Sequence, residues 1–175
     1  MHYPLLPILL IIAPRFSVLP ALALNDGIIH CDIIEGTFDT NTFYSFISHL
    51  LDKMQPYPAP KSVVVMDNCR IHKHPEILRL IESWYALICT YFALLNLILS
   101  FSGMRYEFLP PYSPDYNPIE LAFSAMKYHL RCNGEYIQMA INEMSMTEVT
   151  CVLLEALYQI SPSDVFGWFR HCNYV

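Results

Sequence analysis

Two short stretches of the sequence contain side chains that could form an active site. In the first, "SVVVMDNCRIH" (62–72), Asp67 directly follows a run of β-branched residues, and Asn68 and His72 lie close behind it. Such a run is typical of a strand buried on both faces, and open α/β sheets bind ligands at the carboxyl ends of their strands. Asp67 is therefore a candidate catalytic residue, although an aspartate that starts an Asx-turn explains this stretch equally well.

The histidines of this stretch, His72 and His74, are two residues apart in a predicted loop. That spacing favours solvent-facing histidines over metal ligands. We treat Asn68 and His72 as residues that support Asp67.

The second stretch, "LPPYSPDYNPIE" (109–120), holds more prolines than a simple connection needs. Each proline fixes one backbone angle, so the loop is rigid up to Glu120. Asn117 is placed to cap the helix that follows, Pro118 to occupy its first position and Glu120 its third. A reciprocal capping box would by itself explain Glu120 without catalysis.

The helix predicted over 118–131 has two distinct faces. An apolar stripe is formed by Ile119, Phe123, Met126 and Leu130, and the opposite face carries Glu120, Ser124, Lys127 and Arg131. Residues three and four apart are neighbours on a helix surface. Glu120 therefore lies beside two cations suited to contact phosphates.

Composition predicts one globular domain without long-range attraction to nucleic acid. The chain has 175 residues and a formal net charge of −6, so binding to DNA would need a local basic patch or a separate basic domain. Its six cysteines include no C-x-x-C pair, which indicates reduced thiols in an intracellular protein that is not secreted.

The pattern of elements predicts a mixed sheet with helices packed on it. Strands are expected over 15–24, 27–36, 62–67 and 105–110, and the first two are joined as a hairpin at Asn25–Asp26–Gly27. Helices are expected over 40–54, with a Thr cap, and over 74–82 and 118–131. The remainder of the chain is expected to be mostly helical.

Taken together, the strand ending in "MDN", the helix start "IHKHPEI" and the string "PPYSPDYNPIE" resemble the catalytic domain of mariner-like transposases of the DDE superfamily, which are ribonuclease-H-like DNA endonucleases. The resemblance runs from about residue 15 to 174. It implies that Asp67 and Glu120 are the second and third carboxylates of a metal-binding triad. Mg²⁺ or Mn²⁺ would then serve two-metal phosphoryl transfer on DNA.

The resemblance also implies partners and location. The partners would be transposon-end DNA and a second transposase subunit, with no small-molecule substrate, in the nucleus or another intracellular compartment. Lys127 and Arg131 would contact phosphates, and Asn117 and Pro118 would hold Glu120 in place.

The sequence departs from the family in its first strand. The first aspartate of the triad lies upstream of the hairpin, where residues 1–14 contain no Asp or Glu. We interpret 1–14 as a non-homologous apolar segment before a partial DDE domain over 15–175, and the amino-terminal DNA-binding region of such transposases is also missing. Asp26 and Asp32 are poor substitutes, because one lies in the turn and the other in the second hairpin strand. Residues 5–13 could fill the central strand position without supplying the aspartate.

A second departure is an insertion. Asp67 and Glu120 are separated by 52 residues, 18 more than in the best-known subgroup of the family, and residues 84–101 number 18. We hypothesise that 84–101 is a translated intron. The uncharged run 84–104 is also long enough to span a membrane, although it lacks a clear basic flank.

Three functions remain open at this point. The leading hypothesis is a truncated transposase domain that is inactive in the given sequence. The second is a non-catalytic, domesticated fragment that binds DNA or protein, and the third, minor alternative is a protein anchored in a membrane through 84–104. Whether the chain is an enzyme is left open, because the first catalytic aspartate is absent.

Overall fold

The computed structural model describes residues 4–7, 10–12, 16–84, 103–132 and 144–175. Its strands are β1 (Pro4–Pro7), β2 (Leu10–Ile12), β3 (Phe16–Ala23), β4 (Gly27–Glu35), β5 (Val63–Met66) and β6 (Arg105–Phe108). Its α-helices are α1 (Thr40–Leu51), α2 (Pro75–Ser83), α4 (Pro118–Cys132), α6 (Met146–Tyr158) and α7 (Pro162–His171), and the 3₁₀ turns η1 (Ile71–Lys73) and η2 (Pro114–Tyr116) precede α2 and α4.

The predicted hairpin is formed by β3 and β4, which pair antiparallel from Phe16 opposite Glu35 to Ala23 opposite Gly27. The Asp26 amide donates to the carbonyl of Ala23, and Gly27 has a φ of 76°. A side chain at that angle would be strained, which is why the glycine belongs there. The hairpin therefore closes through three residues, 24–26.

The central position of the sheet is occupied by the amino-terminal segment. β1 pairs antiparallel with β3 and parallel with β5, and β6 pairs parallel with the other edge of β5. β2 continues along β3 in the same register, since Leu6 faces Leu22 and Leu10 faces Val18. The expectation that residues 5–13 could fill this position is confirmed for β1, which lies between β3 and β5, whereas β2 pairs with β3 alone among the described strands.

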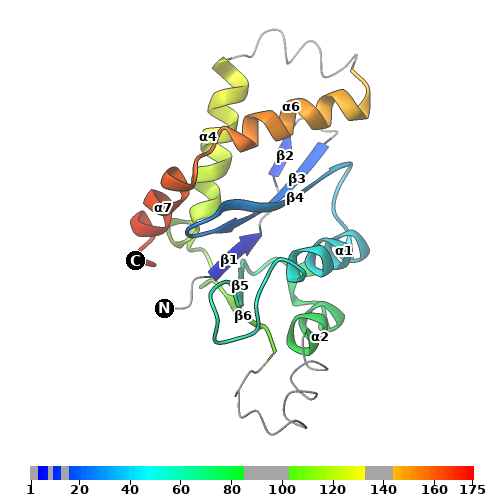
Figure 1. Ribbon diagram of the computed structural model, residues 1–175. Helices are drawn as coiled ribbons and strands as arrows, with labels where there is room; N and C mark the ends of the chain where they lie inside the picture. Colours follow the sequence, from blue (N-terminus) through cyan, green and yellow to red (C-terminus); the bar gives the residue numbers. More distant parts are fainter. Residues whose placement is uncertain (1–3, 8–9, 13–15, 85–102, 133–143) are drawn as a thin grey trace, which may run out of the picture.

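Helices cover both faces of the sheet (Figure 1). Alternate residues of β3 point to opposite faces, as expected for a strand: Val18 and Leu22 belong to the core beneath α4, α6 and α7, whereas Leu19 and Ala21 belong to the core beneath α1 and α2. Both cores are continuous and apolar, so β3 and β5 are held from two sides. Loops at the strand ends can then be positioned precisely against this frame.

The amino-terminal cap of α1 differs from the prediction. Asp39, and not Thr40, is the cap: its carboxylate accepts from the Thr42 amide at 2.8 Å, and the Thr42 hydroxyl accepts from the Asp39 amide at 2.9 Å. This reciprocal pair satisfies two amides that the first turn leaves without partners. The helix ends at Leu51, earlier than expected, although Met54 is still buried.

Among the residues that the structure describes, no helix has the length and apolar character needed to cross a membrane. The run 84–104, considered above as a membrane anchor, and the run 84–101, considered as a translated intron, lie outside the described residues, except for residues 84, 103 and 104. The chain on the two sides of these segments is in contact, because Gly103 lies against the backbone carbonyl of Glu82. The chain therefore leaves α2 and re-enters β6 at nearly the same place.

Candidate active site

Asp67 directly follows β5, at the carboxyl end of the strand. Its Oδ1 atom accepts from the Cys69 amide at 2.8 Å, so the Asx-turn interpretation is confirmed. The same Oδ1 lies 2.7 Å from Nδ1 of His72. Within the described residues both contacts use Oδ1, which leaves Oδ2 available to a ligand.

The pKa of Asp67 is set by opposing effects. Partial burial alone would raise it, but the contact with His72, the Cys69 amide and the positive charge of Lys73 together outweigh burial, and the pKa of Asp67 is lowered. Asp67 is therefore held as a carboxylate at neutral pH, which is the form that binds cations.

The expectation that His72 faces solvent is wrong. Its side chain is buried, with 2% of its surface exposed, and its ring packs on Phe43 of α1 with the ring centroids 4.5 Å apart. The turn η1 directs the ring inward, where the apolar surface of α1 covers it. The contact of Nδ1 with Asp67 is short but poorly aligned for a hydrogen bond.

Asn68 connects the two halves of the site. Its side-chain amide donates to the carbonyl of Leu109, and the Leu109 amide donates to the carbonyl of Met66 at 2.8 Å. These bonds fix the start of the proline-rich loop at the end of β5. Asn68 thus helps to fix the start of the loop that leads to Glu120.

The capping prediction at the start of α4 is correct for Asn117 and Pro118 but not for Glu120. Asn117 is buried, its side-chain oxygen accepts from the Ile119 amide at 3.4 Å, and Pro118 occupies the first helical position. The Asn117 amide is already bonded to the carbonyl of Pro114 at 2.9 Å. It is therefore not available for a reciprocal bond from Glu120.

The carboxylate of Glu120 is exposed and makes no hydrogen bond or ion pair with any described residue. A capping role thus no longer accounts for it. Lys127 and Arg131 are exposed on the same face of α4, as the helical spacing predicted, and Ile119, Phe123 and Met126 are buried on the other.

Asp67 and Glu120 lie on the walls of one cavity. Its volume is about 310 Å³, and it is lined by Asp67, Asn68, Cys69, Leu109, Pro110, Tyr112, Ser113, Pro114, Asn117 and Glu120. The end of β5 supplies one wall, and the proline-rich loop with the first turn of α4 supplies the other. The two stretches that stood out in the sequence thus converge, although 52 residues separate their carboxylates.

Sequence reasoning missed two residues of this cavity. The thiol of Cys69 lies with the donor atoms of Asp67 and His72 in a group whose members are all within 4.8 Å of one another. Its position two residues after an Asx-turn aspartate was the available signal. Tyr112 is fully exposed at the rim and has a φ of 56°, an angle that sequence patterns do not reveal for a tyrosine.

Among the described residues, Asp67 and Glu120 are the only carboxylates that line this cavity. Asp26 lies in the hairpin turn and pairs with Lys61 at 3.4 Å, and Asp32 on β4 contacts His30. Neither lines the cavity, as predicted. The central strand β1, and β2 beside β3, contain no Asp or Glu in their sequence.

Comparison with known proteins identifies the family of this chain. The family model of the DDE superfamily endonucleases matches residues 13–140. The chain belongs to the DDE superfamily of endonucleases. No curated protein matches it.

Two solved structures share the fold of this DDE domain. The catalytic domain of Mos1 transposase, determined with raltegravir and Mn, matches with a TM-score of 0.60 and 14% identity over 97% of this chain and 76% of that chain. The Mos1 strand transfer complex matches with a TM-score of 0.56 and 12% identity, over 97% of this chain and 50% of that chain. The predicted ribonuclease-H-like fold is thereby confirmed.

Proposed function

We propose that this DDE domain retains two of the three carboxylates of a metal-dependent nuclease, binds Mg²⁺ or Mn²⁺ weakly, and does not cut DNA in the given sequence. One observation carries the proposal: Asp67 and Glu120 line the same cavity of about 310 Å³, whereas the central strands contain no carboxylate. The cavity therefore has part of a cation site and lacks the rest.

The residues of the cavity fit a hard divalent cation in part. Asp67 is held as a carboxylate with one oxygen uncommitted, and Glu120 has no partner among the described residues, so both offer the oxygen ligands that Mg²⁺ prefers. When bound, such ions supply an activated nucleophile and stabilise the leaving oxygen in phosphoryl transfer. Two carboxylates leave most of the coordination shell to water, which favours weak binding.

The chain's own residues would then position DNA rather than cleave it. Asn68 and the cap formed by Asn117 fix the two walls of the cavity, and Lys127 and Arg131 place positive charge on the exposed face of α4 that begins at Glu120. The phosphate groups of DNA are suitable binding partners for these two positively charged side chains. We propose that the DNA bound in this way is transposon-end DNA and that a second transposase subunit is the protein partner. Binding would take place in the nucleus or another intracellular compartment.

A nicking assay tests the proposal. Purified protein is incubated with supercoiled plasmid and Mn²⁺, beside the variants Asp67→Ala and Glu120→Ala. We expect no nicking above background in any sample, because the geometry of the metal pair lacks its first carboxylate. Robust nicking by the unaltered chain that either substitution abolishes would contradict the proposal and show that another residue completes the site.

A second candidate function is a domesticated fragment that binds DNA or protein without catalysis. Two observations favour this function. The sheet is formed and has a continuous apolar core on each face, whereas only two of the described carboxylates line the cavity. Plasmid binding without nicking, weakened in Lys127→Ala and Arg131→Ala but not in Glu120→Ala, would support this function.

We also propose that 84–101 is an insertion foreign to the fold. The contact between Glu82 and Gly103 supports it, because a short link could join α2 to β6 directly. Sequencing of the transcript across codons 80–106 tests the idea. A spliced message without these codons is expected, and a uniform message that retains them would overturn the intron hypothesis.

A further inference from the structure

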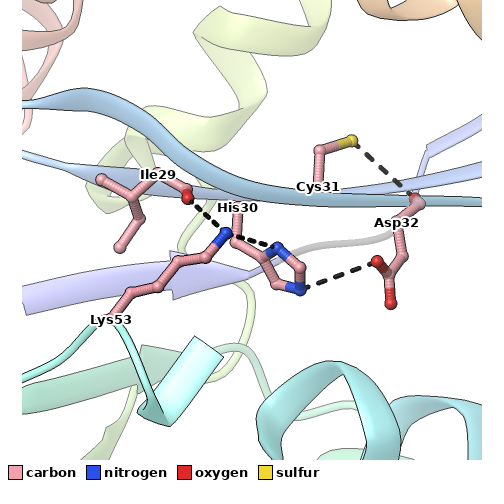
Figure 2. A network of polar contacts seen from close by, with 5 residues as sticks. All are labelled: Ile29, His30, Cys31, Asp32 and Lys53. Carbon is pink, nitrogen blue, oxygen red and sulfur yellow. Dashed lines mark hydrogen bonds and ion pairs between the residues drawn. The ribbon is translucent and has the colours of Figure 1, made fainter. Parts of the chain in front are cut away.

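A second cluster of donor atoms lies on the opposite face of the sheet from α4, between β4 and α1. We propose that His30, Asp32 and His49 form a binding site for a divalent transition-metal ion of the Zn²⁺ type, separate from the cavity of Asp67 and Glu120. The donor atoms of the three residues all lie within 4.8 Å of one another. Figure 2 shows the part of the cluster that β4 contributes, together with Lys53.

The fold brings the three ligands together from two elements. His30 and Asp32 are two residues apart on β4, so they share the face of the strand that is turned to α1. Nε2 of His30 lies 3.6 Å from Oδ1 of Asp32, and the ring of His49, from the last turn of α1, meets the His30 ring edge-on with centroids 6.1 Å apart. The C-terminal end of a helix also favours positive charge.

The distances are close to those of a bound ion. Zn²⁺ binds imidazole nitrogen and carboxylate oxygen at about 2.0–2.2 Å in a tetrahedral arrangement, which places neighbouring donor atoms roughly 3.3 Å apart. The separation of His30 and Asp32 is already near this value. His49 is exposed, so its side chain is able to rotate the short distance that remains.

The ring of His30 is held in place by packing, and its Nε2 atom makes no hydrogen bond within the described part of the chain. Its ring stacks on Phe46 of α1, with centroids 4.9 Å apart and an angle of 20° between the planes. Its Nε2 atom is shielded from solvent and has no hydrogen-bond partner within the described residues. Buried polar atoms are rarely left in this condition, and a metal ion would satisfy this one.

Lys53 competes with the metal. Its ammonium group lies 3.1 Å from Nδ1 of His30 and donates to the carbonyl of Ile29 at 3.0 Å (Figure 2). Because an ammonium group can only donate, this contact places the His30 proton on Nε2, the atom that would bind the ion. Metal binding requires the tautomer protonated on Nδ1, so Nε2 releases a proton to solvent, Nδ1 takes one up, and Lys53 withdraws.

The donor set selects the class of metal. Two imidazoles and one carboxylate suit Zn²⁺ and similar ions, whereas Mg²⁺ prefers oxygen ligands alone. Cys31, between His30 and Asp32 in sequence, points to the other face of the sheet and packs with the core beneath α6 and α7. Burial raises the pKa of its thiol to about 12, which disfavours a thiolate ligand. The site is thus a three-ligand centre with an open position.

Zinc titration against a chromophoric chelator tests this site. All proteins carry Asp67→Ala and Cys69→Ser, which remove the donor group of the nuclease cavity. In this background we expect one remaining Zn²⁺ site whose affinity falls at least tenfold in His49→Ala. The matched control is His171→Ala, which removes an exposed histidine from α7 and should change nothing.

Lys53→Met distinguishes a metal site from a cluster with a purely structural role. Because Lys53 opposes the metal-binding tautomer, its removal should raise the affinity for Zn²⁺ about tenfold. The proposal is overturned if the background variant binds no zinc, if His49→Ala and His171→Ala bind equally well, or if Lys53→Met weakens binding. His49 and Lys53 are both exposed, so neither substitution removes core packing.

Discussion

The contact between Asp67 and His72 should contribute a measurable coupling energy to folding. A hydrogen bond to a charged group contributes about 1.5–3 kcal/mol. Here the Asp67 side chain is 39% exposed and the contact is poorly aligned, so solvent screening reduces the expected value to about 1 kcal/mol. Substitution of His72 by Phe retains a ring against Phe43 and removes only the polar contact.

A double-mutant cycle isolates the coupling energy between the two side chains. The free energy of unfolding in urea at pH 7 is measured for the unaltered chain, Asp67→Ala, His72→Phe and the double variant. His72→Phe should cost about 1 kcal/mol, and Asp67→Ala about 2 kcal/mol because it also removes the bond from the Cys69 amide. The double variant should cost about 2 kcal/mol, which gives a coupling near 1 kcal/mol. Additive costs, with a coupling of roughly zero, would refute this reasoning.

The same contact sets a pH dependence. Because the pKa of Asp67 is lowered in the folded protein, its stabilisation is complete above the ordinary aspartate value of about 3.9 and is lost as the pH falls through the lowered folded value. The difference in unfolding free energy between the unaltered chain and His72→Phe should therefore be constant from pH 7 to 5 and shrink at more acidic pH. A difference that grows on acidification would contradict the assignment.

Three further predictions concern the elements around the cavity. Asn117→Ala should lower the free energy of unfolding by about 1 kcal/mol, since it removes the cap of α4, and Asn117→Ser should restore most of that loss in urea unfolding. Tyr112→Gly should raise stability by about 0.5–1 kcal/mol, because the tyrosine is fully exposed at a positive φ; a lower melting temperature would show that its ring makes contacts. Deletion of 84–101 should leave a folded protein that is more stable by up to about 2 kcal/mol, because the flanking residues already touch and the closed loop is shorter; aggregation or loss of cooperative melting would count against it.

The hairpin and the ends of α2 and α4 could be predicted because their signals are local. The glycine of the β3–β4 turn and the prolines at the first positions of α2 and α4 determine the backbone angles at their own positions. The resemblance in the two motif stretches then predicted which distant elements meet. It predicts that Asp67 and Glu120 share one site, and both residues line the same cavity.

Other features depended on tertiary contacts that no local pattern encodes. His72 is buried because Phe43, far away in sequence, lies over its ring. The reciprocal cap at Glu120 fails because the Asn117 amide bonds instead to Pro114 in a 3₁₀ turn. The cluster around His30 was not predicted either, since His49 approaches it from a separate helix.

The central claim is that Asp67 and Glu120 together bind a divalent cation, and titration of Mn²⁺ followed by electron paramagnetic resonance tests it most directly. The unaltered chain is compared with Asp67→Asn, Glu120→Gln and Glu155→Gln, which makes the same change of charge at an exposed site on α6. We predict weak binding that falls about tenfold in each of the first two variants and is unchanged in the third. Equal affinity in all four proteins, or an effect of Asp67→Asn without one of Glu120→Gln, would contradict a shared site.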